Sequence, residues 1–127
     1  MAGVTYDTGA LVAGERNDRR MWALHAGFLA EEVAPVVPAH ALAQAWRGGA
    51  RQASLSRLLA MCDVEPMTEV QARQVGVLAG KSAHDDVVDV TVVEGAIRRR
   101  HAVVTANEDH IRRVADAARV RLRIERV

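Results

Sequence analysis

The chain has 127 residues, of which 50% are hydrophobic and 26% are charged, and its formal net charge is +1. This composition predicts one domain, residues 1–127, with a hydrophobic core, and the near-neutral charge argues against general affinity for polyanions. The single cysteine excludes an intrachain disulfide. The sequence has neither an export signal nor the run of roughly 20 apolar residues that crosses a membrane, so we expect a cytoplasmic protein with no membrane partner.

Short apolar runs alternate with helical patterns along the whole chain, and glycine, proline and capping residues mark the boundaries between them. In chain order we predict a strand at residues 3–6, helices at 8–12 and 20–32, a strand at 34–37, helices at 39–47 and 51–61, a strand at 64–66, helices at 68–78 and 86–100, a strand at 102–105, a helix at 108–118 and a strand at 120–124. This order predicts the α/β class, with a parallel sheet covered by helices on both faces.

Two apparent motifs do not meet the requirements of the sites they suggest. Residues 76–82, Gly-Val-Leu-Ala-Gly-Lys-Ser, resemble a phosphate-binding loop, but three residues separate the glycines where four are needed, and a helix precedes them where a strand is needed. We interpret this segment as a helix end, with Gly80 as terminator and Lys81 in the loop beyond. The five histidines and the cysteine show no zinc-ligand spacing, which argues against a zinc site.

Aspartates stand where predicted strands end or where the next helix begins. Asp7 closes the first strand, Asp109 follows the fourth, and Asp86 and Asp89 are spaced i, i+3 at the start of a helix. The carboxyl ends of parallel strands meet at one edge of a sheet, where ligands bind in such folds. Because carboxylate oxygens are the ligands of hard divalent cations, the sequence predicts a metal site at that edge.

Four segments occur together in an order typical of one family. They are residues 7–11 (Asp-Thr-Gly-Ala-Leu), 37–49, 86–89 (Asp-Val-Val-Asp) and 103–109. In this order they resemble the PIN-domain family and, more narrowly, the VapC-type toxins of bacterial toxin–antitoxin pairs. The resemblance covers essentially the whole chain. It implies a single PIN-like domain with a five-stranded parallel sheet, which acts as a metal-dependent ribonuclease, forms a homodimer and is inhibited by a small antitoxin.

The resemblance also implies which residues carry the chemistry. Asp7, Asp86 and Asp89 would hold Mg²⁺ or Mn²⁺, and Asp109 would close the catalytic site from the other side. Thr8 would orient a water molecule at the metal. An ion held in this way activates water and neutralises charge on a phosphodiester. The implied partners are an RNA substrate and a cognate antitoxin, which would bind along residues 46–59.

The chain departs from the family pattern at three positions. The family generally has a glutamate where Gln44 stands and often an aspartate where Asn107 stands, and it tends to place a final acid where this chain has His110. Gln44 and Asn107 can offer carbonyl oxygens, but they bring no negative charge to offset the dehydration of a divalent ion. We therefore expect weaker metal affinity, and weaker activity, than in a fully acidic site.

Other interpretations of these residues remain open. Asp7 and Asp86 stand at helix N-termini, where an aspartate commonly caps the first turn. A second hypothesis is therefore a PIN-fold protein that does not cleave, and that binds RNA or an antitoxin-like partner through its arginines, which are 16 of the 17 basic residues. A third is a phospho-acceptor receiver domain, but that class needs a lysine at the end of a strand, and the only lysine is Lys81.

Overall fold

In the computed structural model, which describes residues 3–127, five strands form one parallel sheet in the order β3-β2-β1-β4-β5. The strands are β1 (Val4–Tyr6), β2 (Val36–Pro38), β3 (Asp63–Glu65), β4 (Ala102–Thr105) and β5 (Ile124–Arg126). The helices are α1 (Thr8–Glu15), α2 (Arg19–Ala30), α3 (Ala39–Ala45), the short 3₁₀ helix η1 (Ala50–Gln52), α4 (Ala53–Leu59), α5 (Glu69–Ser82), α6 (Val87–Arg99) and α7 (Glu108–Ala117). The predicted α/β class is confirmed.

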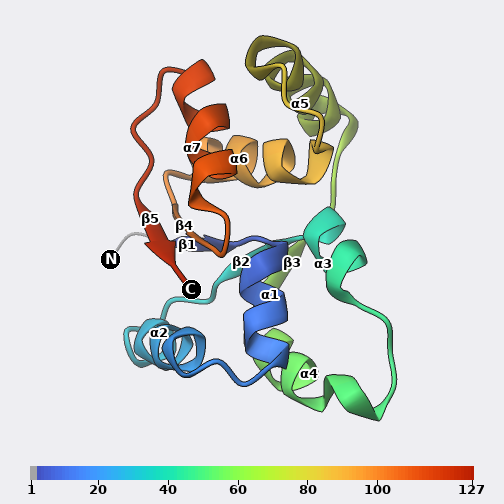
Figure 1. Cartoon of the computed structure of the whole chain (residues 1–127), viewed down its shortest axis with the longest axis vertical. Helices are drawn as coiled ribbons and strands as arrows, with labels where there is room; N and C mark the ends of the chain where they lie inside the picture. The colour runs from blue at the N-terminus through green and yellow to red at the C-terminus, as the bar shows by residue number, and fades with distance from the viewer. Residues whose placement is uncertain (1–2) are drawn as a thin grey trace.

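Helices cover both faces of the sheet (Figure 1). On one face α5, α6 and α7 pack against one another, and α6 lies on β1. On the other face α1 lies on β4 and also packs against α2 and α4. The neighbouring parallel strands β1 and β4 lead directly into α1 and α7. The first turns of these two helices therefore lie at the same edge of the sheet, the carboxyl edge.

The core lies between the central strands and the helices on each face. All three residues of β1 are buried, as are Val103, Val104 and Thr105 of β4, which is the pattern of a parallel sheet covered on both sides. Helix α6 contributes several fully buried valines, and burying each such side chain stabilises the fold by roughly 1.5–3 kcal/mol. Within residues 3–127, neither α6 nor any other helix has the length and apolar composition needed to cross a bilayer.

Helix α1 begins unusually close to the end of β4. A methyl group added at Gly9 would lie 2.7 Å from Cβ of Ala106 and 3.1 Å from its backbone nitrogen. Ala106 directly follows β4, so the missing side chain at Gly9 allows the two segments to approach. This approach brings Asp7 and Thr8, at the start of α1, beside the segment that leads to Asn107.

The predicted end of α5 at Gly80 is wrong. The helix begins after Thr68, whose side chain accepts a hydrogen bond from the Gln71 amide at 3.1 Å as expected, but it continues through Ser82 and ends at Ala83 in the left-handed conformation (φ 50°). Lys81 consequently lies in the last turn of the helix and not in a loop. A glycine inside a helix costs about 1 kcal/mol, which the packing of neighbouring buried residues offsets.

Several other boundaries differ from the prediction. The helix predicted at 39–47 ends at Ala45, and the one predicted at 51–61 is divided into η1 and α4. The reason is the buried side chain of Gln52, because its Oε1 accepts hydrogen bonds from the backbone amides of Arg47 and Gly48, both at 2.8 Å, and holds them out of a helix. The last strand also lies later than predicted, since Ile124 pairs with Val103.

Candidate functional site

Asp7 lies at the carboxyl edge of the sheet, between β1 and α1. Its backbone amide donates to the carbonyl of Val104 at 3.2 Å, and its Oδ1 accepts from the Ala10 amide at 2.9 Å, so Asp7 caps α1. Its side chain is almost fully buried. Burial raises the pKa of Asp7 to about 6, a nearby negative charge on Asp89 raises it too, and hydrogen bonds from Thr105 and from backbone amides lower it in part.

Thr8 and Gln44 contact each other beside Asp7. The Thr8 hydroxyl donates to Oε1 of Gln44 at 2.7 Å, across the interface between α1 and α3. This hydrogen bond fixes the direction of the hydroxyl and also occupies the amide oxygen that was expected to be free for a metal or its water. Gln44 is exposed, so its side chain can exchange this bond for one to water.

Asp86 and Asp89 lie at the start of α6, as predicted. Oδ1 of Asp86 accepts from the backbone amides of Val88 at 2.9 Å and Asp89 at 3.4 Å, which is the capping role left open by the sequence. Asp86 is exposed, whereas the side chain of Asp89 is only 17% exposed. Asp89 is also the residue whose charge acts on Asp7. The structure thus brings Asp89 toward Asp7 and leaves Asp86 on the surface of the helix end.

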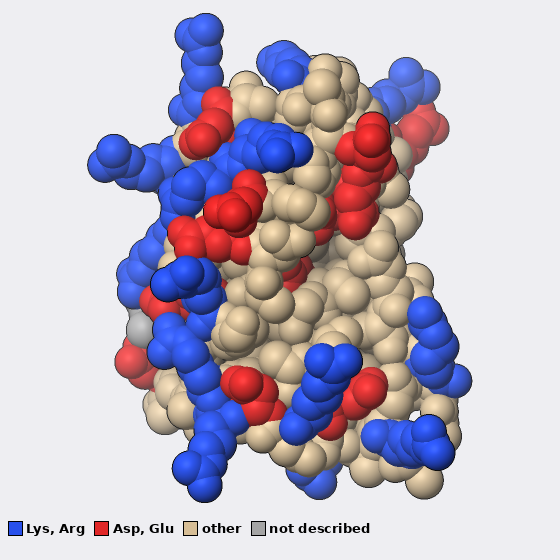
Figure 2. All heavy atoms as spheres, viewed as in Figure 1, with Lys and Arg blue, Asp and Glu red and all other residues tan. Residues whose placement is uncertain are grey.

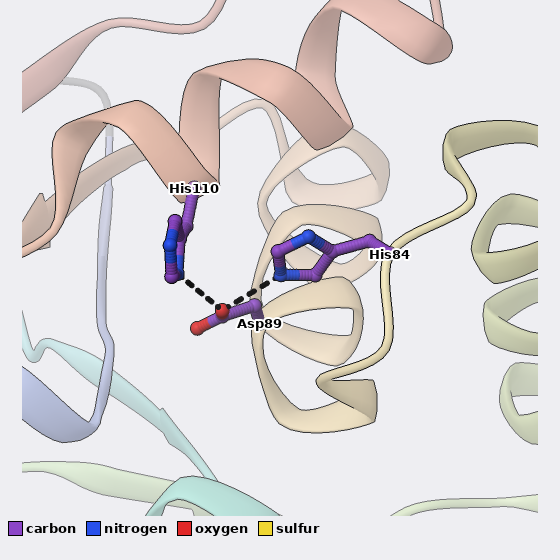
Figure 3. A group of neighbouring side chains, drawn as sticks. All are labelled: His84, Asp89 and His110. Carbon is purple, nitrogen blue, oxygen red and sulfur yellow. Dashed lines mark hydrogen bonds and ion pairs between the residues drawn. The ribbon is translucent and has the colours of Figure 1, made fainter.

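Two histidines flank Asp89 (Figure 3). Oδ2 of Asp89 lies 2.9 Å from Nε2 of His84 and 3.5 Å from Nδ1 of His110, and the ring centroids of the two histidines are 5.3 Å apart. Nδ2 of Asn107 lies 2.8 Å from the same Nδ1 of His110. The sequence predicts no zinc site, because the histidines lack zinc-ligand spacing, but the fold brings His84 and His110 together beside Asp89. Linear spacing fails to find them because they come from different segments of the chain.

The sequence contained one usable signal for this cluster. His110 stands where the resembling family tends to have an acid, and a residue in such a position is a candidate for the same pocket. His84 gave no comparable signal, because it lies in the irregular connection between α5 and α6. Asp109, predicted to close the site, is exposed in the first turn of α7 and forms no hydrogen bond or ion pair with the part of the chain that the structure describes.

The residues present fit a divalent cation. Asp7 and Asp89 are two carboxyl groups close enough to repel each other, and a dication between or beside them would relieve that repulsion. Their oxygens suit the predicted Mg²⁺ or Mn²⁺, whereas imidazole nitrogens such as those of His84 and His110 suit zinc, iron and nickel better. The pocket therefore offers a mixed set of oxygen and nitrogen ligands.

The five-stranded parallel sheet with helices on both faces is a VapC-like PIN fold. A chain in the crystal structure of VapBC2 from Rickettsia felis, bound to a DNA fragment from their promoter, has the same fold. The two chains superpose with a TM-score of 0.74 at 15% sequence identity, and 98% of each chain is covered. Neither a protein-family model nor a curated protein sequence matches this chain.

Proposed function

We propose that the chain, as a single PIN-like domain, is a cytoplasmic divalent-metal-dependent endoribonuclease and the toxin of a type II toxin–antitoxin pair. The observation that supports this most directly is the position of the buried Asp7 at the carboxyl edge of the sheet, near enough to Asp89 for the charge of Asp89 to raise the pKa of Asp7. Two neighbouring carboxyl groups, one of them buried, have little structural value by themselves, because a buried ionised group loses hydration. In a nuclease the same pair is needed to hold a cation against a phosphodiester.

The roles of the residues follow from their positions. Asp7 and Asp89 would hold Mg²⁺ or Mn²⁺, with Asp86 as an outer carboxylate, and the bound ion would supply charge neutralisation and an acidified water. The Thr8 hydroxyl donates to Gln44 and would accept a hydrogen bond from that water through its oxygen. Asp109 would close the site from its exposed side. Asn107 positions His110 through its side-chain amide.

RNA would approach the site along an open groove beside the strand ends. The groove has a volume of about 700 Å³ and is lined by Arg20, Ala106, Glu108, Glu125 and Arg126, among others. Both arginines are exposed and form ion pairs, Arg20 with Glu125 and Arg126 with Glu108, each at 3.3 Å. Such pairs are weak enough for phosphate to replace the carboxylate. Figure 2 shows Lys and Arg side chains projecting around the rim of one face, whose centre is mostly uncharged.

Two protein partners belong to the proposal. The antitoxin would bind along residues 46–59, where Trp46 is 42% exposed and the buried Gln52 rigidifies the loop. A second copy of the chain would pack on α5, which exposes Val70 and Val77. Large exposed apolar side chains of this kind are typical of protein contact surfaces. The Rickettsia felis complex, which contains VapBC2 and promoter DNA, supports an antitoxin as partner.

A catalytically inactive PIN-fold protein is the second candidate. Gln44 favours it, because this residue brings no charge to the site and uses its oxygen to bind Thr8. In that case the same groove would bind RNA, or an antitoxin-like partner, without cleaving the nucleic acid.

Cleavage of a structured RNA in the presence of Mn²⁺ separates the two candidates. We expect slow cleavage by the natural chain, loss of cleavage in Asp7→Asn and faster cleavage in Gln44→Glu, which adds a carboxylate beside Thr8. Asp18→Asn is the matched control, because Asp18 caps α2 through a 2.8 Å bond to the Met21 amide but lies away from the site. RNA binding without cleavage in all four proteins would refute the nuclease and support the inactive binder.

A further inference from the structure

Three potential metal ligands from separate elements meet at the candidate site. His84 comes from the connection between α5 and α6, Asp89 from the first turn of α6 and His110 from the first turn of α7. One donor atom of each lies within 4.8 Å of the donor atoms of the other two. The His84 side chain is only 6% exposed, whereas that of His110 is 46% exposed. The cluster is thus closed on one side and open to solvent on the other.

Two of the three distances within the cluster, those from Asp89 to each histidine, are close to the distances between ligand atoms around a bound metal. Ligand atoms about 2.1 Å from a tetrahedral or octahedral ion lie roughly 3.0–3.4 Å from one another. Oδ2 of Asp89 lies 2.9 Å from Nε2 of His84 and 3.5 Å from Nδ1 of His110. Small side-chain rotations therefore suffice to place all three atoms around one ion.

The side chain of His110 faces both Asn107 and Asp89. Its Nδ1 lies 2.8 Å from Nδ2 of Asn107 and 3.5 Å from Oδ2 of Asp89. A neutral histidine offers a metal the lone pair of one ring nitrogen. The Asn107 amide, which is exposed, can turn to water and leave Nδ1 of His110 free for an ion.

We propose that His84, Asp89 and His110 bind a first-row transition-metal dication, such as Zn²⁺, Co²⁺ or Ni²⁺, in preference to Mg²⁺. Two imidazoles and one carboxylate favour these ions, because Mg²⁺ binds oxygen ligands and rarely gives up its water for nitrogen. Three protein ligands leave further positions open to water or to a phosphate oxygen. The inference rests on the proposed function at one point, where it assigns the bound ion to an RNA-cleaving site. Metal binding itself requires no RNA.

Titration with Co²⁺ tests the proposal directly, because Co²⁺ bound to imidazole and carboxylate gives visible absorption bands. We expect such bands in the natural chain, with Zn²⁺ displacing Co²⁺ and with millimolar Mg²⁺ failing to do so. His84→Ala and His110→Ala should each weaken Co²⁺ binding at least 10-fold. His110→Ala is the safer variant for folding, because the His110 side chain is half exposed, and far-UV circular dichroism checks both.

Two variants serve as matched controls. His40→Ala removes an exposed imidazole on α3, and Asp116→Ala removes an exposed carboxylate further along α7. Both should bind Co²⁺ as the natural chain does. The proposal is overturned if folded His110→Ala binds Co²⁺ as tightly as the natural chain, if His40→Ala loses as much affinity, or if Mg²⁺ displaces Co²⁺ at equal concentration.

The same proteins separate this inference from the proposed function. Co²⁺ bands that depend on His110, in a chain that cleaves no RNA with any metal, would support the metal site and refute the nuclease. Cleavage with Mg²⁺ that persists in His110→Ala, in a chain without Co²⁺ bands, would support the nuclease and refute the transition-metal site.

Discussion

Asp7 and Asp89, at the starts of α1 and α6, share one electrostatic environment. Burial raises the pKa of Asp7 to about 6, and the negative charge of Asp89 adds to that effect. The ordinary value is 3.8, so between these two pH values the folded state binds more protons than the unfolded state. The free energy of unfolding therefore falls as the pH rises through this window, by on the order of 3 kcal/mol for this group.

The first prediction is that Asp7→Asn stabilises the metal-free protein at neutral pH. An asparagine keeps the cap on α1, since its side-chain oxygen can accept from the Ala10 amide, but it has no charge to desolvate. In EDTA at pH 7.5 we expect a gain of about 1–3 kcal/mol in chemical denaturation, and a much smaller gain at pH 4. The exposed cap variant Asp18→Asn should show no such pH dependence. A loss of stability in Asp7→Asn at pH 7.5 would contradict the electrostatic account.

The second prediction concerns the groove beside the strand ends. Arg20→Ala and Arg126→Ala should each weaken binding of a structured RNA severalfold and reduce the slope of log affinity against log salt by about one, because each removes one phosphate contact. Arg121→Ala is the control, since Arg121 lines a separate cavity with Gly3 and His101 at the opposite, amino edge of the sheet. Fluorescence anisotropy over a range of salt concentrations provides the measurement. Equal effects of all three substitutions would mean that RNA does not use this groove.

The third prediction tests the close approach of α1 to β4. Gly9→Ala should cost about 1–3 kcal/mol of stability, because the new methyl group would meet Ala106 at 2.7 Å and its backbone cannot move freely. Gly27→Ala, in the middle of α2, should instead gain about 0.5–1 kcal/mol, since nothing lies within 4 Å of the added atom. Urea denaturation compares the two. If Gly9→Ala left the free energy of unfolding unchanged, the two segments would not be in contact.

The fourth prediction concerns a buried histidine under the sheet. The Tyr6 hydroxyl and Nδ1 of His25 lie 2.8 Å apart, whereas Nε2 of His25 is buried without a partner among the described residues. Tyr6→Phe therefore leaves both ring nitrogens unsatisfied and should cost about 1–3 kcal/mol. In a His25→Leu background the same substitution should cost clearly less. Additive costs in this double-mutant cycle would argue against the hydrogen bond.

The same histidine makes the fold sensitive to acid. Burial lowers the pKa of His25 below its ordinary value of 6.5, so the unfolded state binds a proton more readily than the folded state. Its stabilising contribution is complete above that value and is lost as the pH falls below it. We expect His25→Leu to reduce the loss of thermal stability between pH 7 and pH 5. An unchanged loss would assign the acid sensitivity to other groups.

The elements that could be predicted from the sequence are those with strong local signals. The apolar run around Val103, the cap at Asp86 and the i, i+3 spacing of Asp86 and Asp89 are all local signals, and the strand and the helix start that they predicted are present. The end of α5 differs from the prediction because a glycine such as Gly80 ends a helix only where side-chain packing does not stabilise the next turn. The break near Gly48 depends on the distant buried amide of Gln52, which no local pattern reveals.

The candidate site is divided in the same way. The positions of Asp7 and Asp89 can be predicted, because each follows or begins a predicted element and parallel strands bring such positions to one edge. The position of His84 beside Asp89 cannot, since it depends on how far α5 extends before Ala83 turns the chain. The sequence leaves the capping role of Asp86 open, and the coordinates show its hydrogen bond to the Val88 amide.

The capping role of Asp7 has a practical consequence for work with the proposed toxin. Only Oδ1 of Asp7 accepts the Ala10 amide, so an asparagine whose oxygen takes that position keeps the cap. Replacing the other oxygen with an amide nitrogen would remove one ligand of the proposed metal while the shape of the side chain stays the same. A folded Asp7→Asn protein could then serve as bait for the proposed antitoxin.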